Sequence, residues 1–305
     1  MAEISMTAKI SAFARAYHAR HCDVKIFDDP LAAALLSEEE YGQVAAHMTA
    51  GLPFFNPSFT GTPEEGLEWI VANQLAPSPL GRAAFAERAL ETAVRIGAAQ
   101  YLILGAGYDT FGWRQPGWAR ALQIFELDRP ETGSDKRRRL AAAGLEQPEN
   151  LTFVGADFTQ PGWTDALRQC PAFSDRKITF CSLLGLVYYL TRRDFEGLVD
   201  ALGALLPAGS ALAFDYPDGD SGGERAGEQD RKQRQLAGGA REEMRTGYAC
   251  AELEALLAAH GFLIYEHLRP EEITAQYFAA FNRAHPGHPM RALDNVCYCL
   301  AVKRE

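Results

Sequence analysis

A glycine turn directly after an apolar run is the first place where this sequence could hold a ligand. Residues 101–104 form the run, and Gly105, Ala106 and Gly107 follow it. Glycine lets the backbone turn sharply at a strand tip, and it lets a ligand approach without a Cβ in the way. The same pattern also fits an ordinary tight turn, so its meaning depends on the residues that surround it.

Acids stand at the ends of the next two predicted strands. Asp128 comes 23 positions after Gly105, close to the spacing of roughly 20 at which an acid accepts hydrogen bonds from ribose hydroxyls. Asp157 ends the following strand, where it can accept a hydrogen bond from the amine of adenine, and Phe158 beside it can cover the ring. A glycine turn with two such acids predicts a nucleoside site.

The residues after the turn indicate which nucleoside cofactor fits. A dinucleotide site has a third glycine and faces a pyrophosphate with a helix N-terminus. Here Thr110 stands at the place of that glycine, and Asp109 puts a negative charge where the pyrophosphate would lie. S-adenosyl-L-methionine has no phosphate and carries a sulfonium and an ammonium group. We therefore expect this cofactor, with S-adenosyl-L-homocysteine as product, and keep an NAD-dependent oxidoreductase as an alternative.

The elements that must position these residues alternate between short apolar runs and helical stretches, which is typical of a parallel α/β sheet flanked by helices. The predicted strands are 101–104, 123–127, 152–154, 177–183, 211–215, 262–268 and 296–303. The close spacing of the last two predicts a Rossmann-like sheet of seven strands whose last strand is antiparallel. That inference requires the helical-looking stretch 271–283 not to be a crossover helix.

The chain divides into a predicted cap and a predicted core. Residues 1–96 read as a helical N-terminal cap, and residues 97–305 as the cofactor-binding core with a lid inserted at about 217–247. We expect the two parts to form one compact unit. Within the cap, Pro77 to Pro79 predicts a break before a helix at 81–96.

Several strings occur in an order that one known family shares. They lie at 7–16, 27–32, 81–85, 102–110, 125–136, 157–158 and 185–191. On these strings the chain resembles the leucine carboxyl methyltransferase family, and most closely its bacterial branch, which includes the tetracenomycin polyketide carboxyl methyltransferase. The resemblance implies a class I methyltransferase fold, S-adenosyl-L-methionine as cofactor and O-methylation of a small-molecule acceptor.

The resemblance also implies roles for particular residues. It assigns the methionine carboxylate to Arg82 and to a basic residue near the N-terminus, for which Arg15 is our choice and Lys9 the alternative. A family glutamate that binds the cofactor ammonium is replaced by Leu184, and we expect backbone carbonyls around Gly105 and Leu183 to take its place. The full expected cofactor set is Arg15, Arg82, Gly105, Ala106, Gly107, Asp128, Asp157, Phe158 and Leu183.

The methyl acceptor is expected to be a carboxylate of a secondary metabolite. A carboxylate is already ionised at pH 7 and needs no general base, whereas a phenol usually needs one, and no histidine ends a strand in the cofactor half. We therefore name no catalytic residue, and expect Tyr108, Tyr188 and Tyr216 to line the acceptor pocket. A hydroxyl-directed O-methyltransferase and a non-catalytic adenosyl-binding protein remain alternatives.

Composition excludes several partners. The chain has 305 residues and a net charge of -10, so it repels nucleic acid overall, and its basic run 136–139 reads as a solvated helix face. No cysteine or histidine cluster has metal-site spacing, and no apolar stretch is long enough to span a membrane. We expect a cytoplasmic protein without a metal; the sequence carries no signal for an oligomeric state.

Overall fold

A computed structural model describes residues 6–219, 232 and 247–304. The described residues form one sheet of seven strands in the order β3-β2-β1-β4-β5-β7-β6. The strands are β1 (Gln100–Leu104), β2 (Gln123–Asp128), β3 (Leu151–Gly155), β4 (Thr179–Leu183), β5 (Ala211–Pro217), β6 (Phe262–Leu268) and β7 (Val296–Lys303). The last strand, β7, runs antiparallel to both β5 and β6. The predicted seven-stranded fold with an antiparallel last strand is confirmed.

Both faces of the sheet are buried at its central strands β1, β4 and β5, which explains why these strands are mostly apolar runs. In β1, Tyr101 and Ile103 enter one hydrophobic cluster, while Leu102 and Leu104 enter another on the opposite face. The alternation follows from the two-residue period of a strand.

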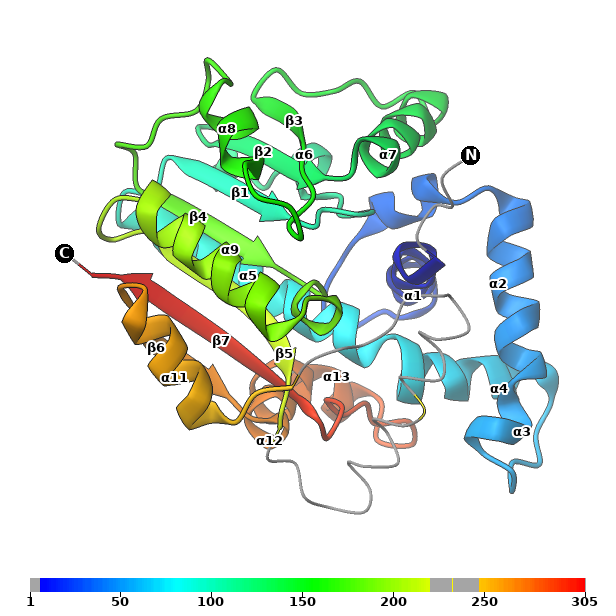
Figure 1. The fold of residues 1–305 in the computed structure, drawn as a ribbon. Helices are drawn as coiled ribbons and strands as arrows, with labels where there is room; N and C mark the ends of the chain where they lie inside the picture. The colour runs from blue at the N-terminus through cyan, green and yellow to red at the C-terminus, as the bar shows by residue number, and fades with distance from the viewer. Residues whose placement is uncertain (1–5, 220–231, 233–246, 305) are drawn as a thin grey trace.

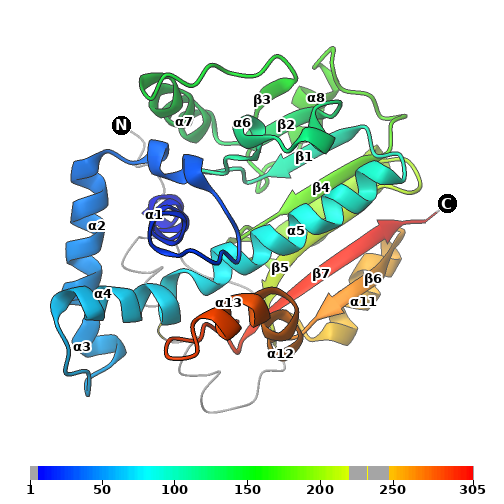
Figure 2. The same cartoon turned by 180° about the vertical axis from the view of Figure 1, so that it is seen from behind.

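Helices cover each face (Figures 1 and 2). The first cluster packs under α5 (Pro77–Arg95), and the second packs under α9 (Arg192–Leu205). The other elements after β1 are α6 (Phe111–Arg114), η3 (Gly117–Ala119), α7 (Pro130–Ala142), α8 (Trp163–Arg168), η4 (Val187–Tyr189), α11 (Cys250–Ala259), α12 (Pro270–Ile273), η5 (Thr274–Phe278) and α13 (Ala279–Ala284).

The helical cap precedes β1 and lies beyond the carboxyl ends of the parallel strands (Figure 1). Besides α5, which covers one face of the sheet, its elements are α1 (Met6–His21), η1 (Pro30–Leu35), α2 (Glu38–Ala50), α3 (Leu52–Phe55), α4 (Pro63–Ile70) and η2 (Val71–Leu75). Phe13 of α1 and Ile70 of α4 belong to the same cluster as Tyr101 of β1. Cap and sheet therefore share a hydrophobic core. Most of the predicted lid, 220–231 and 233–246, lies outside the described residues.

One local prediction differs from the structure, and one condition that the fold prediction required is met. Pro77 to Pro79 do not break the chain but form the first turn of α5, where backbone N–H groups have no partner within the helix and proline loses nothing. The stretch 271–283 is helical, as α12, η5 and α13, yet it is not a crossover, because it leads into the antiparallel strand β7.

Candidate functional site

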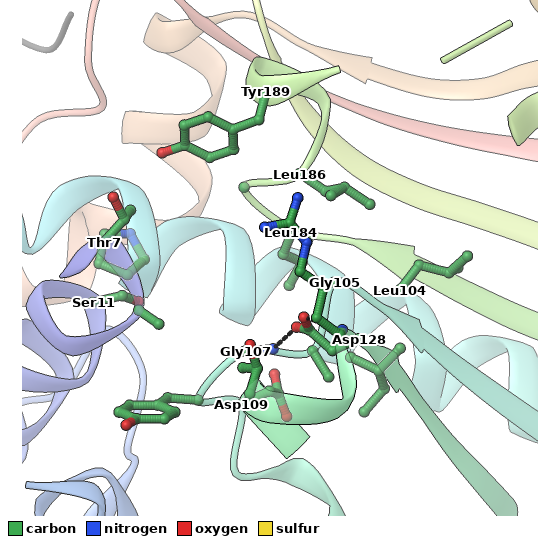
Figure 3. A pocket seen from close by; sticks show the side chains of 18 of the residues that line it. Thr7, Ser11, Leu104, Gly105, Gly107, Asp109, Asp128, Leu184, Leu186 and Tyr189 are labelled. Atoms are coloured by element: carbon green, nitrogen blue, oxygen red, sulfur yellow. Dashed lines mark hydrogen bonds between the residues drawn. The ribbon is translucent and has the colours of Figure 1, made fainter. Parts of the chain in front are cut away.

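A pocket lies at the carboxyl ends of β1 to β4, between the sheet and the cap (Figure 3). Its volume is about 520 Å³, within the range of roughly 300–1,000 Å³ that is usual for small-molecule sites. Thr7 and Ser11 of α1 form one wall, and Leu184 and Leu186 after β4 form another. In the sheet, β2 and β3 lie on one side of β1, and β4 and β5 lie on the other. The pocket is at this change of direction, where open α/β sheets generally bind their ligands.

The glycine turn forms the floor of this pocket. Gly105 and Gly107 have φ values of +68° and +47°, in the left-handed region that disfavours side chains. A Cβ on Gly105 would lie 3.1 Å from the Leu186 side chain, which would have to shift slightly, so crowding adds to the preference for glycine that the positive φ creates. Its backbone is fixed to the end of β2, because Gly105 N donates to Leu127 O at 2.8 Å.

Asp128 joins the turn to the predicted ribose position. Its Oδ2 accepts from Gly107 N at 2.6 Å, and its Oδ1 accepts from Arg129 N at 2.7 Å. Burial raises the pKa of this carboxyl, although both backbone hydrogen bonds oppose the shift. Each carboxylate oxygen has a second lone pair, so a ligand hydroxyl can still bind to either.

Asp157 and Phe158 line the same pocket after β3. Asp157 Oδ1 accepts from both the hydroxyl and the N–H of Thr159, at 2.7 and 3.0 Å, and these bonds lower its pKa. Phe158 packs edge-on against Trp163 with 5.3 Å between ring centroids. The loop thus holds an acceptor and a ring face beside each other.

Arg82 of α5 also lines the pocket. Its Nη1 donates to Asp215 Oδ2 at 3.2 Å, and Asp215 Oδ1 accepts from Gly185 N at 2.6 Å. Arg82 is therefore held from behind by a buried residue of β5.

Only one of the two N-terminal basic residues, Arg15 and Lys9, lies at the pocket. Arg15 lines the pocket, forms a buried ion pair with Asp29, and donates from Nη2 to the carbonyl of Tyr108 at 2.7 Å. Lys9 does not line it, because its ammonium is paired with Glu40 at 2.8 Å. Of the two, Arg15 is the residue at the pocket.

The predicted tyrosines are only partly at the pocket. Tyr108 lines it, although its hydroxyl donates to Asp135. Tyr188 and Tyr216 do not line it: both are buried, and the Tyr216 hydroxyl lies 2.7 Å from His267 Nε2. Tyr189 lines the pocket instead, since successive residues of a 3₁₀ turn point in different directions.

Leu183 is also away from the pocket. Its side chain belongs to the buried cluster under α9, and the lining begins at the next residue, Leu184. Gly185, with φ of +70°, turns the chain there. Sequence reasoning missed Arg114, which lines the pocket and pairs with Glu87; no local string signals a partner so far away in sequence.

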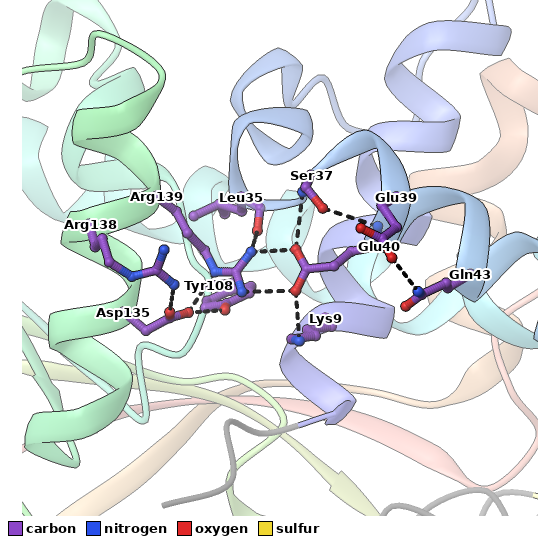
Figure 4. Close-up of polar contacts among 10 residues, drawn as sticks. All are labelled: Lys9, Leu35, Ser37, Glu39, Glu40, Gln43, Tyr108, Asp135, Arg138 and Arg139. Atoms are coloured by element: carbon purple, nitrogen blue, oxygen red, sulfur yellow. Dashed lines mark hydrogen bonds and ion pairs between the residues drawn. The ribbon is translucent and has the colours of Figure 1, made fainter. Parts of the chain in front are cut away.

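A charge network behind Tyr108 links the cap to the core (Figure 4). Asp135 of α7 accepts from Tyr108 and from Arg139 Nε at 2.6 Å, and Arg139 Nη2 donates to Glu40 of α2 at 2.9 Å. The expected solvated face at 136–139 is therefore wrong at Arg139. It is also wrong at Lys136, which is buried and pairs with Glu126 at 2.6 Å, because this side of α7 faces the cap and sheet.

Among the helices that the structure describes, none has the length and apolar character needed to cross a membrane. Within the described ranges, no group of three or more histidine, cysteine, aspartate or glutamate side chains is placed to hold a metal ion.

The family to which the chain belongs follows from its similarity to known proteins. A family model described as leucine carboxyl methyltransferase matches residues 8–203. The chain belongs to this family. Membership makes it an S-adenosyl-L-methionine-dependent methyltransferase, and it leaves the NAD-dependent oxidoreductase without support.

Individual relatives agree. YktD of Bacillus subtilis, named as an inferred S-adenosyl-L-methionine-dependent methyltransferase, is 39% identical over 99% of each chain. A Mycolicibacterium gilvum protein with the same kind of name is 31% identical over 70% of this chain and 66% of its own.

Among solved structures, a DUF574 family protein from Streptomyces avermitilis has a TM-score of 0.58 at 16% identity, covering 96% of this chain and 97% of its own. A Thermobifida fusca protein described as an inferred methyltransferase has a TM-score of 0.59 at 15% identity, covering 99% and 96%. At these identities the likeness concerns the fold.

Proposed function

We propose that this methyltransferase transfers the methyl group to a carboxylate of a small-molecule acid and so forms a methyl ester. The observation that carries the proposal is the chemistry of the pocket wall. Among the described residues that line the pocket, none is a histidine, lysine or cysteine. A carboxylate acceptor needs no proton removed at pH 7, so a wall without histidine, the commonest general base, suits it.

The described residues fit the cofactor group by group. Asp128 would accept hydrogen bonds from the ribose hydroxyls, and Asp157 with Phe158 would hold the adenine. Arg82 would pair with the methionine carboxylate, with Arg15 as a second guanidinium that lines the pocket. Gly105 has no Cβ, so a ligand can approach its backbone closely.

The cap (1–96) and the core (97–305) would each supply part of this site. The cap contributes Arg15 and Arg82, and the core contributes the glycine turn and both acids. In the structure Arg15 bonds to the backbone of Tyr108 in that turn, so the two parts meet at the cofactor loop.

The reaction is an in-line displacement at an activated methyl group, which S-adenosyl-L-methionine supplies when bound. The chain's part is to hold the acceptor oxygen in line and to exclude water from it. Tyr189, Leu190 and Phe27 present apolar surface to the pocket, which suits a hydrophobic acid.

Paired acceptors test the proposal. The purified protein is incubated with S-adenosyl-L-methionine and hydrophobic carboxylic acids, each beside the phenol on the same scaffold, and methylated products are measured by mass spectrometry. We expect methyl esters, at a rate that changes little between pH 6 and pH 9, because an ordinary carboxylate is ionised throughout. Faster methylation of the phenols, with a rate that rises with pH, would instead support the hydroxyl-directed enzyme.

Binding tests the non-catalytic alternative separately. A protein that binds S-adenosyl-L-homocysteine, raises its melting temperature with it, and methylates no acceptor of either class would be an adenosyl-binding protein. A melting temperature that responds to NAD and not to S-adenosyl-L-homocysteine would contradict the cofactor assignment itself.

A further inference from the structure

We propose that Asp215 is a positioning residue, which holds the Arg82 guanidinium at the place where it receives the carboxylate of the cofactor. The inference rests on the contact between Arg82 and that carboxylate in the proposed function. It adds a residue of β5 that does not line the pocket.

The first support is the way in which Asp215 uses both of its oxygens. Oδ2 accepts from Arg82 Nη1 at 3.2 Å, and Oδ1 accepts from the backbone N–H of Gly185 at 2.6 Å. Both partners line the pocket, whereas the Asp215 side chain is 0% exposed. One buried carboxylate thus connects an arginine of α5 to the turn after β4.

The second support is the packing of the guanidinium against that turn. A Cβ on Gly185 would lie 2.7 Å from Arg82 Nη2 and 2.8 Å from Cζ. Gly185 also has a φ of +70°, which favours glycine. The guanidinium is therefore placed by a direct backbone contact on one side and by Asp215 on another.

The sheet register explains why Asp215 is at the right place. β4 and β5 are parallel neighbours, and Leu183 pairs with Phe214. The next residue of β5, Asp215, therefore lies beside the chain as it leaves β4 and enters the turn at Gly185. The carboxylate stays behind the pocket wall, so it acts on a ligand only through Arg82 and Gly185.

The remaining donors of Arg82 are available to a ligand. A guanidinium has five N–H groups, and among the described residues Asp215 is the side chain that accepts from it. The Arg82 side chain is 17% exposed, in the direction of the pocket that it lines. A flexible arginine fixed in this way before the ligand arrives loses less freedom on binding, which favours affinity.

The experiment measures how strongly the protein prefers a ligand that has the carboxylate. Calorimetry gives the Kd of S-adenosyl-L-homocysteine and of its analogue without the α-carboxylate, and the ratio of the two Kd values is the carboxylate preference. We expect a preference of roughly 10- to 100-fold in the unaltered protein, as for a charge-assisted hydrogen bond. Asp215→Asn should lower this ratio several-fold and leave the Kd of the analogue nearly unchanged.

A matched control comes from the same helix. Arg88 of α5 pairs with Glu266 of β6 at 2.6 Å, also joining α5 to the sheet, but away from the pocket. Glu266→Gln should keep the preference of the unaltered protein. An unchanged ratio in Asp215→Asn overturns the proposal. An unchanged ratio in Arg82→Ala shows instead that the contact between Arg82 and the carboxylate, part of the proposed function, is wrong.

A second variant keeps the proposal testable if Asp215→Asn does not fold. Arg82→Lys retains a charge for Asp215 but lacks the planar fork that meets two carboxylates at once. We expect Arg82→Lys to lose most of the carboxylate preference. Full retention of the preference by folded Arg82→Lys contradicts positioning through the guanidinium and overturns the proposal.

Discussion

Replacing Asp128 with asparagine should weaken cofactor binding while the glycine turn stays folded. In the structure the two carboxylate oxygens each accept one backbone N–H, from Gly107 at 2.6 Å and from Arg129 at 2.7 Å. Asparagine keeps the size of the side chain but offers one oxygen, so its amide nitrogen must face one of these donors. The variant also loses the negative charge that would accept the ribose hydroxyls.

The magnitude follows from the hydrogen bonds at stake. A hydrogen bond to a charged group contributes about 1.5–3 kcal/mol, so the loss of charge at two ribose contacts should cost about 3 kcal/mol, or roughly 150-fold in Kd. The broken bond to the backbone should lower the free energy of unfolding by about 1–3 kcal/mol. The effect on binding should therefore equal or exceed the effect on stability.

Calorimetry with S-adenosyl-L-homocysteine and urea unfolding measure the two effects. Asp165→Asn is the control, because it makes the same change at an exposed position of α8. A folded Asp128→Asn protein that binds with unaltered Kd would refute the reasoning. Burial raises the pKa of Asp128, so affinity in the unaltered protein should also begin to fall at a higher pH than an ordinary aspartate, with its pKa of about 3.9, would cause.

Three further predictions concern stability and are checked by urea unfolding. Burial lowers the pKa of His18 to about 4. Between about pH 4 and pH 6.5 the unfolded chain therefore binds more protons, and the free energy of unfolding should fall by about 3 kcal/mol as the pH drops through this window. His18→Gln should flatten that pH dependence. Glu126→Gln leaves Lys136 buried without its anion and should cost about 3–5 kcal/mol, which replacing both residues by methionine should largely restore; an equally unstable double variant would contradict this. Glu40→Gln should lower the free energy of unfolding by about 1–2 kcal/mol at pH 7, because the hydrogen bond from Arg139 lowers the Glu40 pKa. This stabilisation is present above the usual glutamate pKa and is lost as the pH falls further. Equal stability of variant and unaltered protein at pH 7 would contradict the prediction.

The fold could be predicted from sequence because its signals are local. Every predicted strand agrees with the structure to within two residues at each end. The central strands are buried on both faces, and the alternation of strands with helices predicts a parallel sheet flanked by helices. The start of α5 at Pro77 was harder to predict, because proline serves equally well as a helix breaker and as a first helical residue.

The site was predictable only where it is built from short strings. The turn at Gly105 and the acids Asp128 and Asp157 all line the pocket, as their places after strands predict. The choice between Tyr188 and Tyr189 depended on a rotation within one turn of 3₁₀ helix, which no periodicity reveals.

Partners that are distant in sequence were beyond prediction for a different reason. Arg82 and Asp215 are 133 positions apart, and Glu40 and Arg139 are 99 apart. Each pairing depends on how the helices before β1 dock on the core, on strand β5 for Asp215 and on helix α7 for Arg139. Charged residues of these types are common on solvated surfaces, so sequence alone gives no reason to pair them.

The contact between Arg15 of α1 and the Tyr108 carbonyl has a thermodynamic consequence for the first helix. Because α1 supplies Thr7, Ser11 and Arg15 to the pocket wall, a ligand bound there gains free energy only while α1 is docked. Linkage makes this gain reciprocal: the ligand resists local opening of α1 by the same amount. Hydrogen exchange of the α1 amides therefore reports on occupancy of a pocket whose floor is encoded almost a hundred residues further along the chain.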